Sequence, residues 1–235
     1  MKQSQYFNFC QSVQAGKKLF SVLIDPEAFN SSLTQNLLNS IPEKTTHLFV
    51  GGSTDLHNKT QEVVINLKKH TDLPIFLFPG DYLQITGSAD ALLFLTLLSG
   101  RNAEYLIGQQ VKAVGLIKKT NLEVISTGYI LIDGGSDSSV ARISKTKPIS
   151  QKNIQQIVNT AIAGEYLGCK LIYLEAGSGA INPVSPDIIS LVKKNISIPL
   201  IVGGGIKTQT QIQNAYNAGA NMVVMGTFFE QKMQR

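Results

Sequence analysis

The stretch PLIVGGGIKTQTQIQNAYNAGANMVVMGT, from Pro199 to Thr227, decides the fold. Two short apolar runs, Leu200–Val202 and Met222–Met225, each end in glycine, and a polar segment with helical character separates them. This pattern predicts two buried parallel strands joined by a helix, with glycine after each strand. Glycine lets backbone N–H groups approach an anion, and a helix N-terminus favours negative charge. The stretch therefore predicts a phosphate site; plain turn glycines are the alternative.

Six further apolar runs precede this unit. They lie at Leu19–Ile24, His47–Val50, Pro74–Phe78, Ala91–Thr96, Val124–Ile132 and Leu171–Leu174. Segments with helical spacing or capping residues separate most of them. Eight strands alternating with helices predict one (β/α)8 TIM-barrel domain over residues 1–235, in which the phosphate site follows strands seven and eight. A flavodoxin-like open sheet is the alternative, although eight strands would be many for it.

The regular alternation breaks after the third predicted strand. Residues 81–90 leave room for at most a short helix before the next strand begins at Ala91. A barrel with an irregular or missing third helix leaves part of its sheet uncovered, and we expect Ile75, Leu77 and Leu93 to supply apolar side chains there. Such a strip is either a partner interface or a groove for a long apolar ligand.

The long polar segment from Asp133 to Ser150 follows the fifth predicted strand. A polar stretch of this kind after a barrel strand predicts a lid or binding loop. We expect Ser150 to cap the helix that follows.

The composition bounds the function. The chain has 235 residues, of which 43% are hydrophobic and 16% charged, and no apolar run approaches the roughly 18 residues of a membrane span. Its net charge of +5 comes partly from four Lys-Lys pairs, at 17–18, 68–69, 118–119 and 193–194. Each pair stands just before an apolar run, where cations complement helix C-termini. We therefore expect them on the face opposite the active site, and no nucleic-acid partner.

The cysteines and histidines show no ligand spacing. Cys10 and Cys169 are isolated, so reduced thiols and a cytoplasmic location are expected, and the polar first residues predict no secretory signal. The three histidines are also isolated, which makes a zinc site an unfavoured interpretation.

Polar residues stand at the ends of several predicted strands, which face one mouth in a barrel. Asp25 ends the first strand, Ser53 and Thr54 follow the second, and Tyr173 and Glu175 close the sixth. One carboxylate with a hydroxyl suits Mg²⁺, which prefers oxygen ligands and substrate phosphates. For Asp25 alone, a helix cap or turn role is the alternative.

Seven motifs together resemble the geranylgeranylglyceryl phosphate synthase family, and specifically its second group, which includes bacterial members. In chain order they are LIDPE at 23–27, GGST at 51–54, TGYILIDGG at 127–135, TKP at 146–148, YLEAGSG at 173–179, VGGGI at 202–206 and VMGT at 224–227. They run from the first predicted strand to the last.

The resemblance implies a prenyltransferase on a modified TIM barrel with an irregular third helix and an apolar groove. It would join sn-glycerol 1-phosphate through an ether bond to a polyprenyl diphosphate, such as geranylgeranyl diphosphate, and release diphosphate. The implied Mg²⁺ ligands are Asp25 and Ser53. The implied substrate-binding residues are Tyr173, Leu174, Glu175, Ala176, Gly177, Ser178, Gly179, Gly204, Gly205, Gly226 and Thr227. Family members tend to form homo-oligomers, and a lipid substrate favours transient contact with a membrane surface.

The residue chemistry suits that reaction. Glu175 is placed to take a proton from a glycerol hydroxyl, with Tyr173 as its hydrogen-bonding neighbour. On charge and loop position alone, Arg142, Lys145 or Lys147 would help to hold the diphosphate.

Three alternatives stay open at this point. The first is the same reaction with another prenyl length, such as heptaprenyl. The second is a phosphosugar or amino-acid biosynthetic barrel that shares the glycine motifs. The third is a non-catalytic phosphate-binding barrel.

Overall fold

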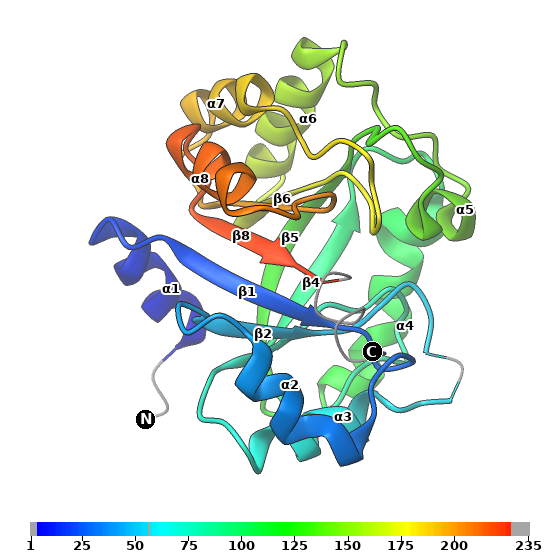
Figure 1. Ribbon diagram of the computed structural model, residues 1–235. Coiled ribbons are helices and arrows are strands. Elements are labelled where there is room, and N and C mark those ends of the chain that lie inside the picture. The colour runs from blue at the N-terminus through cyan, green and yellow to red at the C-terminus, as the bar shows by residue number, and fades with distance from the viewer. Residues whose placement is uncertain (1–3, 56, 227–235) are drawn as a thin grey trace.

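A closed barrel of eight parallel strands forms the centre of the computed structural model, which describes residues 4–55 and 57–226. Each strand pairs with its sequence neighbour, and pairing of Leu19 with Met222 closes β8 onto β1 (Figure 1). The strands are β1 (Leu19–Ile24), β2 (His47–Val50), β3 (Ile75–Leu77), β4 (Ala91–Leu97), β5 (Glu123–Leu131), β6 (Leu171–Glu175), β7 (Leu200–Gly203) and β8 (Met222–Met225). The predicted TIM barrel is confirmed.

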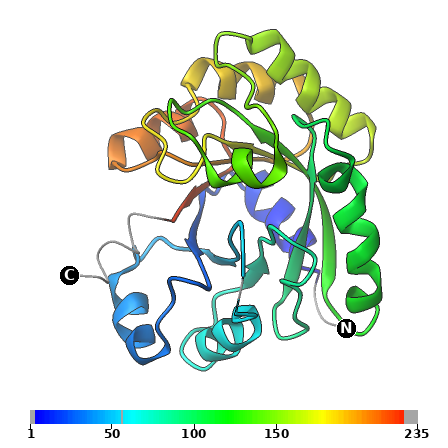
Figure 2. The same cartoon turned by 90° about the vertical axis from the view of Figure 1, so that its right-hand side faces the viewer.

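Helices surround the ring (Figure 2). They are α1 (Gln5–Gln14), α2 (Thr34–Ser40) after a 3₁₀ turn at Ser31–Leu33, α3 (Thr60–Lys68), α4 (Gln109–Ile117) after a π-helical segment at Glu104–Gly108, α5 (Ser139–Ser144), α6 (Ile154–Tyr166), α7 (Pro186–Asn195) and α8 (Gln209–Asn217). The segment predicted as a polar loop between Asp133 and Ser150 therefore contains the short helix α5.

Side-chain caps set where several helices begin. Thr208 and Gln211 form a reciprocal capping box at the start of α8, and Ser185 accepts the Ile188 N–H at the start of α7. The expectation that Ser150 caps α6 is wrong. The N-cap position is Asn153, and the Ser150 hydroxyl instead accepts the N–H of Lys152 in the preceding turn.

Two apolar layers hold the barrel together. One fills its interior and includes Phe49, Phe76, Leu93 and Ile201, while α1 adds Phe9 to the same cluster. The other lies between the strands and the outer helices, where alternate strand residues meet the apolar faces of α3, α6, α7 and α8. Because each strand is buried on both sides, its sequence reads as a continuous apolar run.

The third crossover has no helix, as the sequence predicted. Residues 78–90 are loop and turn, and the gap between α3 and α4 is visible in Figure 2. The expected strip is only partly right: Ile75 and Leu77 point outward but are fully buried in the layer that includes α3 residues. Leu93 points into the barrel interior, with none of its surface exposed. Leu92 and Phe94, its neighbours on β4, are the residues that border the gap.

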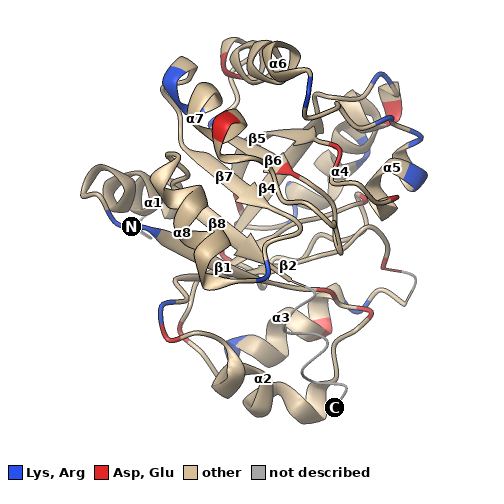
Figure 3. Ribbon diagram, turned by 45° about the horizontal axis from the view of Figure 1, so that its top comes forward, with Lys and Arg blue, Asp and Glu red and all other residues tan. Residues whose placement is uncertain are grey.

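Basic residues are spread over several elements rather than gathered into one stripe (Figure 3). Three of the four Lys-Lys pairs lie at or just after the C-terminal ends of α3, α4 and α7. These helix ends precede the amino ends of the strands, opposite the mouth of the barrel. Within residues 4–55 and 57–226, none of the helices combines the length and apolarity needed to cross a bilayer.

Candidate active site

A cavity of about 880 Å³ opens at the carboxyl ends of the strands. Part of its wall is polar and comes from the loops after β1, β2, β6, β7 and β8. Another part is apolar and runs down the outer side of β4 toward α4. The polar wall includes Asp25, Ser53, Glu175, Ser178, Gly204 and Gly226, and the apolar wall includes Ile85, Leu92, Phe94 and Ala113.

The glycines after β6 and β7 form a close backbone cradle. Gly177, Gly179, Gly204 and Gly205 all have positive φ, between 68° and 101°, which favours glycine. A β-carbon on Gly204 would lie 2.2 Å from Oε1 of Glu175 and 2.6 Å from the backbone nitrogen of Gly177. The loops after β6 and β7 can therefore approach each other this closely only because position 204 carries no side chain. Glycine-rich backbone of this kind is typical of anion-binding loops.

The other residues that the resemblance assigned to substrate binding fall into three groups. Ser178 and Gly226 line the cavity with the cradle. Leu174 and Ala176 belong to the apolar layer outside the strands, so only their backbone can border the site. Thr227 lies outside the described residues.

Glu175 is a buried carboxyl group at the centre of the mouth, with 6% of its surface exposed. Burial raises the pKa of Glu175 to about 7, although hydrogen bonds from the Gly177 N–H, at 2.7 Å, and from the Tyr173 hydroxyl act in the opposite direction. A carboxyl group with a pKa near neutrality is suited to accept a proton during catalysis.

Aromatic rings support this carboxyl group from inside the barrel. The Tyr173 ring stacks on Tyr129 with centroids 5.4 Å apart, and its centroid lies 5.0 Å from that of Phe78. Burial raises the pKa of both tyrosines well above the usual value, so both hydroxyls stay protonated. Phe78 and Tyr129 line the cavity but were not among the predicted site residues. Their positions at or near the carboxyl ends of β3 and β5 were the available signal.

Asp25 and Ser53 face the same cavity from adjacent loops. A β-carbon on Gly52 would lie 2.9 Å from the Asp25 carboxyl group, and one on Gly80 would lie 2.8 Å from Cα of Ser53. Burial raises the pKa of Asp25, a hydrogen bond from the Glu27 N–H lowers it, and the nearby carboxylates of Glu27 and Asp55 raise it.

This donor set fits magnesium. The part of the chain that the structure describes holds no cluster of three or more His, Cys, Asp or Glu side chains able to ligate a metal ion. Mg²⁺ does not need one, because it commonly binds through one or two carboxylates and completes its shell with water and substrate phosphates. Asp25 and Ser53 would supply the protein oxygens of such a site.

The basic residues that line the cavity are only partly those that the sequence predicted. Arg142 lines the cavity, where its guanidinium donates to the Asp137 carboxylate at 2.7 Å, whereas Lys145 and Lys147 are not among the lining residues. Lys207 also lines the cavity and was missed by the sequence reasoning. Its position directly after the GGGI motif was the signal that could have identified it.

The apolar wall ends at a helix of unusual geometry. The π-helical turn Glu104–Gly108 leads into α4, and Gln110 bonds through its amide nitrogen to the carbonyl oxygens of Leu95 and Tyr105. Insertions of this kind are frequent at functional sites. Tyr105 from this turn and Ala113 from α4 line the cavity together with Phe94 of β4.

The fold is a (β/α)8 barrel of the kind that carries its active site at this end, and its cavity combines a glycine-rich polar wall with an apolar wall. Residues 13–235 match the PcrB family, and the chain belongs to this family.

Two relatives that align with 91% and 97% of this chain are both named geranylgeranylglyceryl phosphate synthase. The geranylgeranylglyceryl phosphate synthase of Zunongwangia profunda is 55% identical over 91% of this chain and 92% of its own length. That of Pyrococcus abyssi is 36% identical over 97% of this chain and 90% of its own. The crystal structure of (S)-3-O-geranylgeranylglyceryl phosphate synthase from Thermoplasma acidophilum, in complex with its substrate sn-glycerol-1-phosphate, is 32% identical. It covers 97% of this chain and 92% of its own, with a TM-score of 0.89. The chain is thus a transferase of the prenyltransferase class, as the motifs implied.

Proposed function

We propose that this chain joins sn-glycerol 1-phosphate to a polyprenyl diphosphate, with geranylgeranyl diphosphate as the first candidate. The observation that carries the proposal is that the glycine cradle and the apolar wall line one and the same cavity, together with Glu175. A small phosphate ester and a long hydrocarbon can therefore lie with their reacting ends together. Placing two substrates in this way supplies much of the rate enhancement of a bimolecular reaction.

The cradle has the features required of a glycerol phosphate site. The backbone amides around Gly179, Gly204 and Gly205, which line the cavity, would hold the phosphate, and Glu175 would hold a glycerol hydroxyl. This part of the proposal agrees with the ligand of the Thermoplasma acidophilum relative, which is sn-glycerol-1-phosphate.

Bond formation then needs one proton acceptor and one leaving group. The glycerol oxygen forms a bond to C1 of the prenyl chain, and the bond between C1 and the diphosphate oxygen breaks with its electron pair. Glu175 takes the hydroxyl proton, for which a pKa of about 7 is well matched. Tyr173 holds the carboxylate in place through its hydrogen bond.

Asp25 and Ser53, which line the same cavity as Glu175, would hold Mg²⁺. When bound, the ion neutralises the diphosphate and makes it a better leaving group. Arg142 and Lys207 are the basic residues that line the same cavity, and we assign them to the remaining phosphate charge.

The proposal also includes transient contact with membranes, since both substrate and product carry a prenyl chain. It further includes self-association of the chain. Ile107, Val111 and Val114 form an exposed apolar face, with 58%, 64% and 43% of their surfaces accessible, and this face is our candidate for a subunit contact. Light scattering of the purified chain would test self-association. Flotation with phospholipid vesicles would test membrane contact.

The deciding experiment is incubation with sn-glycerol 1-phosphate and a series of prenyl diphosphates from geranyl to heptaprenyl, with Mg²⁺ or with EDTA. Mass spectrometry would identify the ether product and its chain length. We expect product only with Mg²⁺. No product with any chain length would refute the proposal, and product that persists undiminished in EDTA would refute the metal role.

A further inference from the structure

The loop after β1 fixes Asp25 through the residue two positions later. Pro26 ends the strand because it has no N–H for the ladder, and the chain turns back on itself at once. The backbone N–H of Glu27 then donates to Oδ1 of Asp25 at 2.9 Å. The orientation of the Asp25 carboxylate therefore depends on where Glu27 is held.

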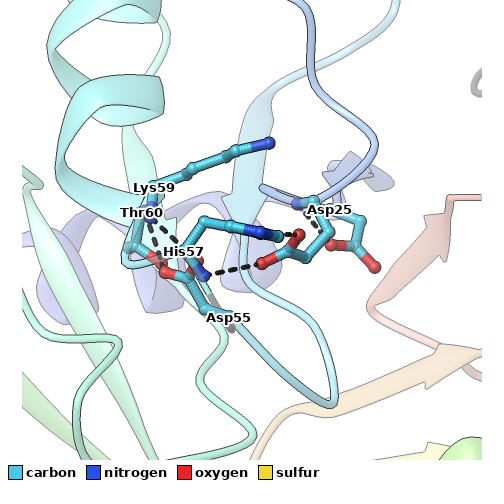
Figure 4. Close-up of polar contacts among 6 residues, drawn as sticks. Asp25, Asp55, His57, Lys59 and Thr60 are labelled. Atoms are coloured by element: carbon cyan, nitrogen blue, oxygen red, sulfur yellow. Dashed lines mark hydrogen bonds and ion pairs between the residues drawn. The ribbon is translucent and has the colours of Figure 1, made fainter.

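Glu27 is held by the neighbouring loop, which follows β2. Its Oε1 accepts the backbone N–H of His57 at 3.1 Å, and its Oε2 lies 2.8 Å from Nδ1 of the His57 ring. Figure 4 shows His57 reaching across toward the loop of Asp25. Nδ1 can donate in the neutral ring as well as in the charged one, so this contact does not require a protonated histidine.

The His57 end of the contact is anchored in turn. Asp55 accepts hydrogen bonds from the backbone N–H groups of Lys59 and Thr60 and from the Thr60 hydroxyl, at 2.6 to 2.9 Å (Figure 4). These bonds fasten the loop to the first turn of α3. Asp55 lies two residues before His57 in the sequence, so its bonds to α3 fix the loop close to the residue that contacts Glu27.

Ser53 lies on that same loop, between β2 and His57. Gly52 brings the loop against Asp25 so closely that even a β-carbon would stand 2.9 Å from the carboxyl group. At their start the two loops are held together by the strands, because Ile24 pairs with Val50 and the Gly51 N–H donates to the Ile24 carbonyl oxygen at 3.1 Å. Farther out, glycine has no side chain that could act as a spacer, so another contact must hold the loops. The contact between Glu27 and His57 is a two-point link that joins them.

We infer that Glu27 and His57 are positioning residues, which hold the loops of Asp25 and Ser53 at the spacing that a divalent cation requires. Neither residue lines the cavity, so neither is expected to touch the ion or the substrate. The inference rests on the proposed function, since it takes Asp25 and Ser53 as the metal ligands. Partners of ligating carboxylates commonly tune metal affinity in this way.

The test measures metal binding directly. Mn²⁺ is titrated into the full chain in the presence of inorganic diphosphate, and free Mn²⁺ is followed by electron paramagnetic resonance. We expect Glu27→Ala, which removes both side-chain bonds, to weaken Mn²⁺ binding about tenfold, and His57→Ala, which removes one, about threefold. His57→Asn should restore binding to within about twofold, because its amide nitrogen can occupy the place of Nδ1.

Two matched variants control for the loss of a surface contact. Glu165 accepts the backbone N–H and hydroxyl of Ser197, and His70 bonds through Nδ1 to the Asn66 carbonyl oxygen. Both lie away from the mouth, so Glu165→Ala and His70→Ala should bind Mn²⁺ like the unmodified chain. Thermal unfolding without metal identifies any variant whose weaker binding reflects a damaged fold.

Asp25→Asn distinguishes the positioning role of Glu27 and His57 from the existence of the metal site itself. If it abolishes Mn²⁺ binding while Glu27→Ala and His57→Ala bind normally, the positioning role is wrong and the proposed metal site stands. If Asp25→Asn binds normally, both are wrong. Loss in both alanine variants with rescue by His57→Asn supports the inference, whereas equal loss in His57→Ala and His57→Asn overturns the role of the ring contact.

Discussion

The hydroxyl oxygen of Tyr173 lies 2.1 Å from the point that a β-carbon on Gly203 would occupy. The absence of a side chain at position 203 therefore leaves the space in which this hydroxyl reaches Glu175. The end of β7 and the end of β6 are fitted to each other at the centre of the proposed site, and register pairs Glu175 directly with Gly203.

Gly203→Ala should damage catalysis more than folding. The added methyl group forces the Tyr173 ring away from Glu175, and a displacement of about 1 Å in a catalytic group can cost roughly 100-fold in rate. Steady-state kinetics should show that loss mainly in kcat. Gly115→Ala is the control, because a β-carbon there meets nothing within 4 Å, and its activity should be unchanged.

Glu175→Gln should remove the proton acceptor, at a cost of roughly 100- to 10,000-fold in kcat. The carboxyl group must be ionised to act as a base, so the activity of the unmodified chain should rise as the pH increases through about 7. The kcat profile of both forms between about pH 5.5 and pH 8.5 checks this. Full activity in the variant would exclude Glu175 as the base.

The titration of Glu175 should also make the free energy of unfolding depend on pH. The pKa of Glu175 is raised in the fold from 4.5 to about 7, so between these values the folded chain binds more protons than the unfolded one. Its contribution is fully present below about pH 4.5 and is lost as the pH rises toward 7, by up to about 1.4 kcal/mol per pH unit. Urea unfolding at several pH values should show this decline only in the unmodified chain. A Glu175→Gln variant with the same slope would contradict it.

Lys207→Ala and Arg142→Ala should each weaken binding of an anionic substrate, with KM raised roughly tenfold, since charge-assisted hydrogen bonds are lost. Separate KM values for glycerol phosphate and for prenyl diphosphate would show which anion each cation serves. Lys145→Ala and Lys147→Ala should have little effect, because neither side chain lines the cavity. Unchanged KM values in all four variants would leave substrate binding to the backbone and the metal.

Ala113→Phe should narrow the apolar wall. Ala113 is buried on α4 and lines the apolar wall, where a phenyl ring would occupy the space proposed for the prenyl chain. We expect turnover of geranyl diphosphate to persist while that of geranylgeranyl diphosphate falls at least about tenfold. Gly115→Phe is a matched control, since a β-carbon at Gly115 on the same helix meets nothing within 4 Å. Equal loss with both substrates would indicate a folding defect instead.

The sequence was most informative where apolar runs end in glycine or proline. The bounds of β1, β2 and β8 follow directly from such runs, and strand-end residues such as Asp25 and Glu175 do meet in one cavity. The side of the sheet that each strand residue faces was harder to predict. The run ALLFLTL in β4 is apolar at nearly every position, so no alternation showed that Leu93 faces inward while Leu92 and Phe94 face the gap.

Features that arise from contacts distant in sequence were not predictable. The π-helical turn before α4 is stabilised by Gln110 reaching Leu95 on a neighbouring strand, and no local pattern signals it. The link between Glu27 and His57 joins two loops 30 residues apart. Ser150 looked like a cap because it precedes a helical pattern, but the chain makes one more turn before α6 begins.

The missing helix leaves the hydrocarbon layer around the barrel unfinished on one side. A prenyl chain lying along Leu92 and Phe94 would complete that layer and act as a temporary replacement for the absent element. Lipid substrate and protein would then stabilise each other, since ligands that bind only the folded state raise its melting temperature. The folded enzyme would be most resistant to unfolding while it carries its hydrophobic substrate, and least so just after the product has left.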